Sequence, residues 1–441
     1  MPEPASRPES QAGSGEGRAP RRQTLPFADV RQSRLLIGSA KPQLLVLNQY
    51  YWPGVEATAH LLSELCEALA EEFEITVVTG HLFGHDELAD EEIRNGVRIV
   101  RVRSTAYERS HLHLRAVNYG SYLAESVQAA LRGRRPDLVV CMTDPPVVGD
   151  IGLLVARRFG VPLLVISQDV FPEVAVQLKR LENPLLVGVL RSLVGLYLRR
   201  ADGIVAIGET MKRRLEEKGA DPERITVIPN WVDTDAILPQ PRDNEWARKR
   251  QLAGRFIVMH SGNVGHAQDL ETLLRAGTFL RDLEDLRIVI VGFGARHADT
   301  VTLTGRLELE EIVRFLPYQS RDVLSESLSS ADLHFVGLAK GLSGFVVPSR
   351  LYGILAAGRP VIVGADPESE TAQLVSEVGC GIVLPPGRPE LVAKAIREAR
   401  EGRYDLEAMG AKGRMYVELE ADRTVAIGRY RHLIRELAVA R

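Results

Sequence analysis

Residues 344–363, GFVVPSRLYGILAAGRPVIV, decide the fold. An apolar run leads to Pro348, which suits the first turn of a helix because its missing N–H would find no partner there. Gly358 suits the end of that helix, and Arg-Pro then opens a second apolar run. A strand, a helix and a second strand in this order predict two neighbouring strands of a parallel sheet.

The same alternation of apolar runs and amphipathic helical segments fills the chain from Pro42 onward. The runs are almost continuously hydrophobic, as in parallel strands covered on both faces. Strands are predicted at residues 43–49, 74–80, 97–104, 136–144, 161–169, 201–208, 255–263, 286–294, 312–318, 331–338, 358–365 and 380–387. The sequence therefore predicts two tandem doubly wound Rossmann-like α/β domains facing each other across a ligand cleft.

Changes in composition set the expected boundaries. Residues 223–246 break the alternation with Pro, Asn and Asp, and the linker is placed within them. The first residues are rich in Pro, Ser, Gly, Glu and Arg, which predicts a disordered tail. The expected parts are the tail (1–41), the N-terminal domain (42–228), the linker (229–246), the C-terminal domain (247–425) and a final helix (426–441) that could pack back on the N-terminal domain.

The composition excludes several functional classes. The chain has 441 residues, of which 45% are hydrophobic and 26% charged, and its net charge of −3 gives no case for nucleic acid. Three distant cysteines favour neither a disulfide framework nor a zinc site, so a reducing cytoplasm is the simplest location. We find no apolar run long enough to span a membrane and no continuous apolar core of a secretory signal.

Candidate ligand-binding residues follow three predicted strands of the C-terminal domain. Glycine-rich loops bring backbone N–H groups close to a phosphate, although an ordinary turn that needs glycine for its geometry is the stronger interpretation of each loop alone. Arg350 falls in the first helical turn, where a cation opposes the helix dipole; a bound anion would justify it, whereas a surface salt bridge is the common alternative. The candidates are Gly262, Asn263, Gly265, His266, Gln268, Gly292, Gly294, Ser343, Gly344, Ser349 and Arg350.

The N-terminal domain offers aromatic and acidic candidates. Tyr50, Tyr51 and Trp52 precede Gly54 in a loop after the first strand, where exposed rings could stack on a sugar unless they pack beneath the loop. Asp169 and Glu173 follow another strand and could hold or deprotonate a sugar hydroxyl, with helix capping as the alternative for Asp169. No Asp-x-Asp follows a predicted strand, so no metal ligands and no cofactor are assigned.

Together these segments resemble the GT-B glycosyltransferases of family 4. The resemblance covers nearly all of the chain from Pro42 and rests on NQYYWPGVEATAHLLSELCEAL (48–69), VIPNWVD (227–233), SGNVG (261–265) and PSRLYGILAAGRPVI (348–362). It is strongest to the WbuB-like branch of surface-polysaccharide and O-antigen sugar transferases. The chain departs from the family where two glutamates are usual, at Phe345 and Gly353, and Asn263 and Gln268 replace the usual Arg and Lys. Glu370 matches a glutamate that the family often has after the next strand, which makes it a candidate donor contact.

The resemblance implies transfer of a sugar from a nucleotide diphosphate, such as a UDP-N-acetyl-aminosugar, with retention and without an essential metal. Asp169, Glu173 and Arg350 would be catalytic, the glycine loops would bind the donor, and the loop from Tyr50 to Gly54 would bind the acceptor. That acceptor would be a polyprenyl-diphosphate-linked or other saccharide at the cytoplasmic face of the inner membrane, on which the enzyme could be peripheral. The apolar segment 183–202 with its arginines fits such a surface, although a core-facing helix is an equal alternative. A UDP-sugar 2-epimerase and a non-catalytic nucleotide-sugar-binding protein stay open.

Overall fold

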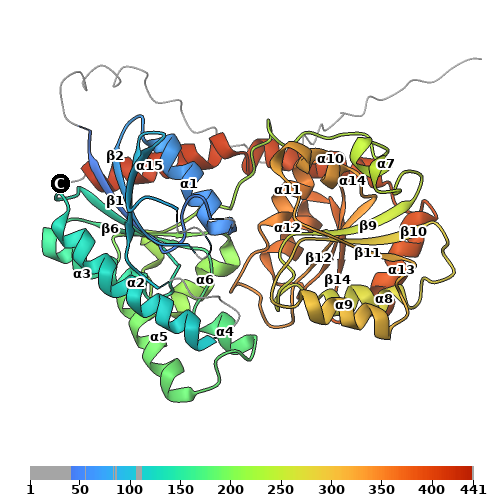
Figure 1. Ribbon diagram of the computed structural model, residues 1–441, viewed down its shortest axis with the longest axis horizontal. Coiled ribbons are helices and arrows are strands. Elements are labelled where there is room, and N and C mark those ends of the chain that lie inside the picture. The colour runs from blue at the N-terminus through green and yellow to red at the C-terminus, as the bar shows by residue number, and fades with distance from the viewer. Residues whose placement is uncertain (1–40, 55, 83, 85–86, 106–111, 440–441) are drawn as a thin grey trace, which may run out of the picture. The chain divides into compact units, whose positions relative to one another are not determined.

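Two parallel sheets organise the computed structural model, which describes residues 41–439 apart from 55, 83, 85–86 and 106–111 (Figure 1). The expected tail 1–41 lies almost wholly outside the described residues. From Lys41 onward the described residues form one compact unit. The two Rossmann-like sheets are the architecture that the alternating pattern predicts, and this expectation is confirmed.

The N-terminal sheet has eight strands in the order β3-β4-β2-β1-β5-β6-β7-β8. All neighbours are parallel except β3, which pairs antiparallel with β4. The strands are β1 Gln43–Leu47, β2 Glu74–Gly80, β3 Glu91–Arg94, β4 Val97–Val102, β5 Leu138–Met142, β6 Leu163–Ser167, β7 Gly203–Ala206 and β8 Ile225–Val227. The helices are α1 Ala57–Leu69, α2 Leu112–Arg132, α3 Val148–Phe159, α4 Glu173–Gln177, α5 Pro184–Leu198 and α6 Glu209–Glu217, with the short 3-10 helix η2 Pro222–Arg224.

Apolar side chains cover this sheet on both faces. On one face α2, α3 and α5 pack over a core that includes Tyr122, Val155 and Tyr197. On the opposite face α1 packs beside the last helix of the chain, and Leu62 and Tyr430 belong to one core cluster (Figure 1). Burial on both faces is the reason why these strands have continuous rather than alternating hydrophobicity.

The C-terminal sheet has six parallel strands in the order β11-β10-β9-β12-β13-β14. The strands are β9 Phe256–Ser261, β10 Leu286–Val291, β11 Val313–Leu316, β12 Leu333–Gly337, β13 Val361–Gly364 and β14 Gly381–Leu384. The helices are α7 Glu245–Lys249, α8 Leu270–Gly277, α9 His297–Arg306, α10 Leu324–Ser329, α11 Arg350–Ala356, α12 Glu370–Val378, α13 Pro389–Arg400, α14 Leu406–Glu420 and α15 Arg423–Val439, with η3 Arg321–Val323. One core cluster joins α8 and α13, and another joins α11, α12 and α14.

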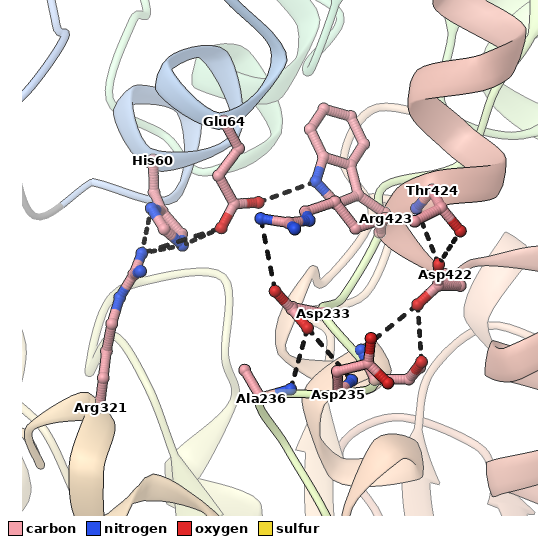
Figure 2. Close-up of polar contacts among 11 residues, drawn as sticks. His60, Glu64, Asp233, Asp235, Ala236, Arg321, Asp422, Arg423 and Thr424 are labelled. Atoms are coloured by element: carbon pink, nitrogen blue, oxygen red, sulfur yellow. Dashed lines mark hydrogen bonds and ion pairs between the residues drawn. The ribbon is translucent and has the colours of Figure 1, made fainter. Parts of the chain in front are cut away.

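Hydrogen bonds to side chains on or next to several helices hold the linker in place (Figure 2). The Trp231 indole donates to Glu64 at 2.9 Å and meets the Tyr430 ring edge-on, with 5.7 Å between ring centroids. Asp422, just before α15, accepts a 2.6 Å hydrogen bond from the Thr234 hydroxyl. The segment that breaks the strand–helix alternation is therefore held at defined points on α1 and at the start of α15.

Candidate functional site

Arg350 opens α11 and reaches back over the carboxyl ends of the C-terminal strands. One guanidinium nitrogen donates to the Gly337 carbonyl at the end of β12, at 2.9 Å. A Cβ added at Gly262, just after β9, would lie 3.5 Å from the Arg350 Cδ. The Nε is buried and finds no hydrogen-bond partner among the residues that the structure describes. The guanidinium is therefore only partly satisfied at the strand edge where α/β sheets bind ligands.

The electrostatics of this edge favour an anion. Burial lowers the pKa of Arg350 to about 10, so the side chain keeps its charge at neutral pH. The buried His260 ring has its pKa lowered to about 3, by burial first and then by the charge of Arg350. In the described chain Arg350 forms no ion pair, and a cation that is partly removed from water loses hydration that a bound anion would compensate. A phosphate group would supply that charge and accept the free N–H.

Two glycine loops pack tightly beside Arg350. Gly262 and Gly292 have φ of +137° and +125°, which side chains rarely adopt. A Cβ at Gly292 would overlap the Gly262 carbonyl oxygen, and one at Gly294 would overlap the Asn263 side chain. Loop packing thus requires these glycines whether or not a ligand binds. This agrees with the alternative that each loop is an ordinary turn that needs glycine for its geometry.

The other residues of the first glycine loop have local partners. Gln268 accepts a 3.0 Å hydrogen bond from the Gly265 N–H, so its amide shapes the loop. His266 is exposed, and its pKa is lowered by partial desolvation and by the positive charges of Arg180 and Arg296. A neutral His266 at the rim is available as a donor or acceptor to a ligand.

The segment before α11 meets the N-terminal domain. Asp169 and Val346 form an isolated antiparallel bridge, and the Val170 N–H donates to the Phe345 carbonyl at 2.9 Å. The Arg214 guanidinium lies 4.9 Å from the centroid of the Phe345 ring. The structure thus brings the predicted catalytic Asp169 beside the predicted donor-binding segment.

Two serines of this segment, Ser343 and Ser349, are ligand-binding candidates. Ser343 is partly buried beside Gly344, whose φ is +77°. Ser349 precedes α11, but its side chain makes no capping hydrogen bond. The Ser349 hydroxyl is therefore not used by the helix and is available for a ligand.

Glu173 has no free carboxylate for the catalytic role predicted for it. Its oxygens pair with Arg191 at 3.0 Å and with Lys218 at 2.7 Å. Burial alone would raise the pKa of Glu173, but the hydrogen bond and charge of Lys218, with help from Arg191, lower it. Glu173 therefore ties α4 to α5 and to the end of α6, on the wall of a pocket of about 380 Å³ that Phe345 also lines.

The expectation of three exposed aromatic rings is wrong for two of them. Tyr50 is 5% exposed and Tyr51 is 1% exposed, since each packs in an apolar cluster beneath the loop. Trp52 is partly buried, and the Arg94 guanidinium lies 4.1 Å from its ring centroid. Burial removes the two tyrosine rings from acceptor stacking, because a sugar cannot reach their faces. The Gly54 N–H donates to the Tyr51 carbonyl at 2.8 Å and closes a tight turn.

Sequence reasoning missed residues that face this region from the N-terminal domain. Thr210 donates to Glu370 through its backbone N–H and its hydroxyl, each at 3.1 Å. Gly208, two residues after β7 ends, was the available signal, since a Cβ there would overlap the Glu370 carboxylate. Asp150 lies in the first turn of α3 with a pKa raised to about 7 by burial, and no motif marks it.

Two family models match consecutive parts of the chain. A glycosyl transferase 4-like domain matches residues 54–231, and a glycosyl transferases group 1 domain matches residues 242–415. The chain belongs to the GT-B glycosyltransferases of family 4. The two matched segments flank the linker; the first covers the N-terminal sheet apart from β1, and the second covers the C-terminal sheet.

Relatives and solved structures agree with this assignment. The glycosyltransferase is 28% identical over 317 residues to the probable glycosyltransferase WbjE of Pseudomonas aeruginosa, covering 71% of this chain and 78% of WbjE. It is 31% identical over 206 residues to the putative colanic acid biosynthesis glycosyl transferase WcaI of Escherichia coli K12, covering 46% of this chain and 50% of WcaI. Crystal structures of HepE from Anabaena with UDP (TM-score 0.70, 15% identity) and of sucrose-phosphate synthase from Thermosynechococcus elongatus (TM-score 0.75, 16% identity) share its fold. They cover 90% and 91% of this chain, and the match spans each of those chains in full.

The glycosyltransferase fills the two glutamate positions of its family pattern with apolar groups. Phe345 is buried against the N-terminal domain core. A Cβ at Gly353 would make ordinary contacts with Leu328 and Ile237, at 3.7 and 3.8 Å. Thr210 donates both of its hydrogen bonds to Oε2 of Glu370, so a donor contact would use Oε1 of the same carboxylate. Within the described ranges, no cluster of three or more His, Cys, Asp or Glu side chains could hold a metal ion, and no helix is long and apolar enough to cross a membrane.

Proposed function

We propose that the glycosyltransferase takes its sugar from a nucleotide diphosphate, with UDP as the carrier, and that the diphosphate binds at Arg350. The observation that carries the proposal is the partly buried Arg350 guanidinium at the carboxyl ends of β9 and β12, whose buried Nε has no partner among the described residues. The glycine turns at Gly262 and Gly292 keep side chains away from this place. HepE, which shares the fold, has been crystallised with UDP and with UDP-glucose, in support of the same donor class.

The proposed reaction is transfer with retention and without a metal ion. The bond between the anomeric carbon and the diphosphate oxygen breaks, and the acceptor hydroxyl oxygen bonds to that carbon from the same face. The charge that develops on the leaving diphosphate is stabilised by Arg350. Asp169, on the neighbouring loop of the N-terminal domain, orients the acceptor hydroxyl, whose proton leaves with the diphosphate or passes to this carboxylate.

We propose a lipid-linked saccharide in surface-polysaccharide assembly as the acceptor, used at the cytoplasmic face of the inner membrane. The support is the similarity to WbjE and to WcaI, whose name places it in colanic acid biosynthesis. An N-acetyl-aminosugar is the proposed donor sugar, as the resemblance to the family branch implies.

The test is a transfer assay with the full chain. UDP-N-acetylglucosamine, UDP-glucose and related donors are incubated with short polyprenyl-diphosphate-linked sugars, with and without EDTA. The expected result is a new glycolipid with the donor's anomeric configuration by NMR, formed equally with EDTA. Epimerised UDP-sugar without acceptor would support the epimerase instead, and UDP-sugar binding without any product would support the non-catalytic reading.

A further inference from the structure

Helix α5 presents an apolar face to solvent. Leu185 is 81% exposed, Val189 56%, Leu193 37% and Leu196 38%. Spacings of four, four and three residues place these side chains along one side of the helix. Such a stripe on an outer helix is unusual, because soluble proteins rarely expose large contiguous apolar patches.

The core explains only the other side of α5. Val187, Val194, Tyr197 and Leu198 are each at most 7% exposed, and Val194, Tyr197 and Leu198 belong to the core beneath the helix. The alternative of a core-facing helix therefore accounts for the buried side chains and leaves the exposed leucines and valine without a role.

Arginines border the stripe. Arg199 and Arg200 directly follow α5, while Arg157 and Arg158 lie in the last turn of α3, and all four are exposed. The helices α3 and α5 contact each other and lie on one face of the sheet (Figure 1). Each helix ends just before the next parallel strand begins, so the four arginines gather at one edge of the sheet.

Among the described residues, no ion pair neutralises this charge, and Asp202 is the nearest acidic residue in sequence to Arg200. Helix α5 contains no Asp or Glu. Within the part of the chain that the structure describes, none of the four arginines takes part in an ion pair. We name the exposed residues Leu154, Arg157, Arg158, Leu185, Leu186, Val189, Leu193, Leu196, Arg199 and Arg200 the α3–α5 face.

We propose that the α3–α5 face docks on an anionic lipid bilayer. The apolar stripe enters the headgroup boundary while the arginines contact lipid phosphates, as amphipathic helices do when they lie in the membrane surface. A second copy of the chain fits less well, because a two-fold interface would set this patch against itself and the α3–α5 face offers no carboxylate to pair with its four arginines. The inference rests on the proposed lipid-linked acceptor for its purpose, but its test uses neither donor nor acceptor.

The test is flotation of the full chain with vesicles of phosphatidylcholine alone or mixed with phosphatidylglycerol, at low and high salt. We expect binding to the anionic vesicles that weakens with salt. Leu185→Gln with Val189→Gln should reduce the partition coefficient at least ten-fold. Arg199→Ser with Arg200→Ser should reduce it about 25-fold, since each basic residue at such a surface contributes about five-fold, or about 1 kcal/mol.

Matched variants elsewhere control for lost apolar area and lost charge. Met415→Gln with Leu419→Gln changes two exposed apolar residues one turn apart on α14. Arg248→Ser with Arg306→Ser removes two exposed arginines of the C-terminal domain. Both control pairs should bind vesicles like the unchanged chain.

Three results would overturn the proposal. In the first, the Leu185→Gln, Val189→Gln variant binds vesicles as well as the unchanged chain does. In the second, the unchanged chain binds neutral and anionic vesicles equally. In the third, light scattering shows that the unchanged chain is a dimer and that this variant is a monomer. UDP binding measured on the same samples reports separately on the donor site, so a failed donor proposal is distinguishable from a failed docking proposal.

Discussion

Asp150 gives a prediction whose sign and size follow from its surroundings. The carboxylate lies in the first turn of α3, and both oxygens are buried without a hydrogen-bond partner among the described residues. Burial raises its pKa from 3.8 to about 7, because the charged form loses its hydration. The substitution Asp150→Asn keeps the size of the side chain and removes this titration.

The folded chain holds the Asp150 proton more tightly than the unfolded chain does. Its contribution to stability is therefore full below about pH 4 and is lost as pH rises to about 7. A shift of about three units corresponds to about 4 kcal/mol, and screening of this partly exposed group reduces the effect to about 1–2 kcal/mol. The Asn variant should thus be about 1–2 kcal/mol more stable than the unchanged chain at pH 8, with a smaller difference at pH 5.

Urea denaturation at pH 5 and pH 8 gives the free energy of unfolding of the unchanged chain and of Asp150→Asn. Comparison at each pH cancels the titration of all other groups. The exposed Asp235→Asn, which also replaces one carboxylate by an amide, is the matched control. The reasoning is refuted if the Asp150→Asn difference is the same at both pH values, or if this variant is the less stable chain at pH 8.

Two further substitutions test the glycine loops and the linker. Gly292→Ala should destabilise the fold by about 2 kcal/mol and abolish UDP binding, because the Cβ would overlap the Gly262 carbonyl. The control Gly305→Ala, on α9, should be neutral or slightly stabilising in the same thermal and calorimetric assays. Unchanged stability and UDP binding in Gly292→Ala would contradict the packing argument. Asp422→Ala should lower the free energy of unfolding in urea by about 1–3 kcal/mol, because the hydroxyl and N–H of Thr234 lose their acceptor. An unchanged free energy of unfolding would show that this contact does not stabilise the linker.

Much of the fold could be predicted from the sequence because burial on both faces makes parallel strands visible. The predicted strand at 136–144 has an apolar centre, LVVCM, and the structure places β5 Leu138–Met142 on that centre with every residue buried. The edge strand β3 Glu91–Arg94 was not predicted, since its sequence EEIR pairs on one side only and needs no apolar run. Strand β8 Ile225–Val227 lies within the segment that breaks the alternation, where Pro and Asn obscure it.

The site was less accessible to sequence reasoning because its contacts join distant residues. Arg350 was found from its place in a helix start that has no use for a cation. The pairing of Glu173 with Lys218 and the burial of Tyr51 depend on which elements pack together. A local pattern marks a carboxylate or an aromatic ring after a strand, but it does not tell whether that group faces a ligand, a lysine or the core.

The most direct test of the central claim is calorimetric titration of UDP into the unchanged chain and into Arg350→Met. Methionine keeps an unbranched side chain in the same space, and the exposed Arg248→Met is the control. A charge-assisted hydrogen bond contributes about 1.5–3 kcal/mol. The account therefore predicts UDP binding that weakens about 10- to 150-fold in Arg350→Met and stays unchanged in the control, with the ligand-free variant melting no lower than the unchanged chain. Equal UDP affinity in Arg350→Met and the unchanged chain would contradict a diphosphate site at Arg350.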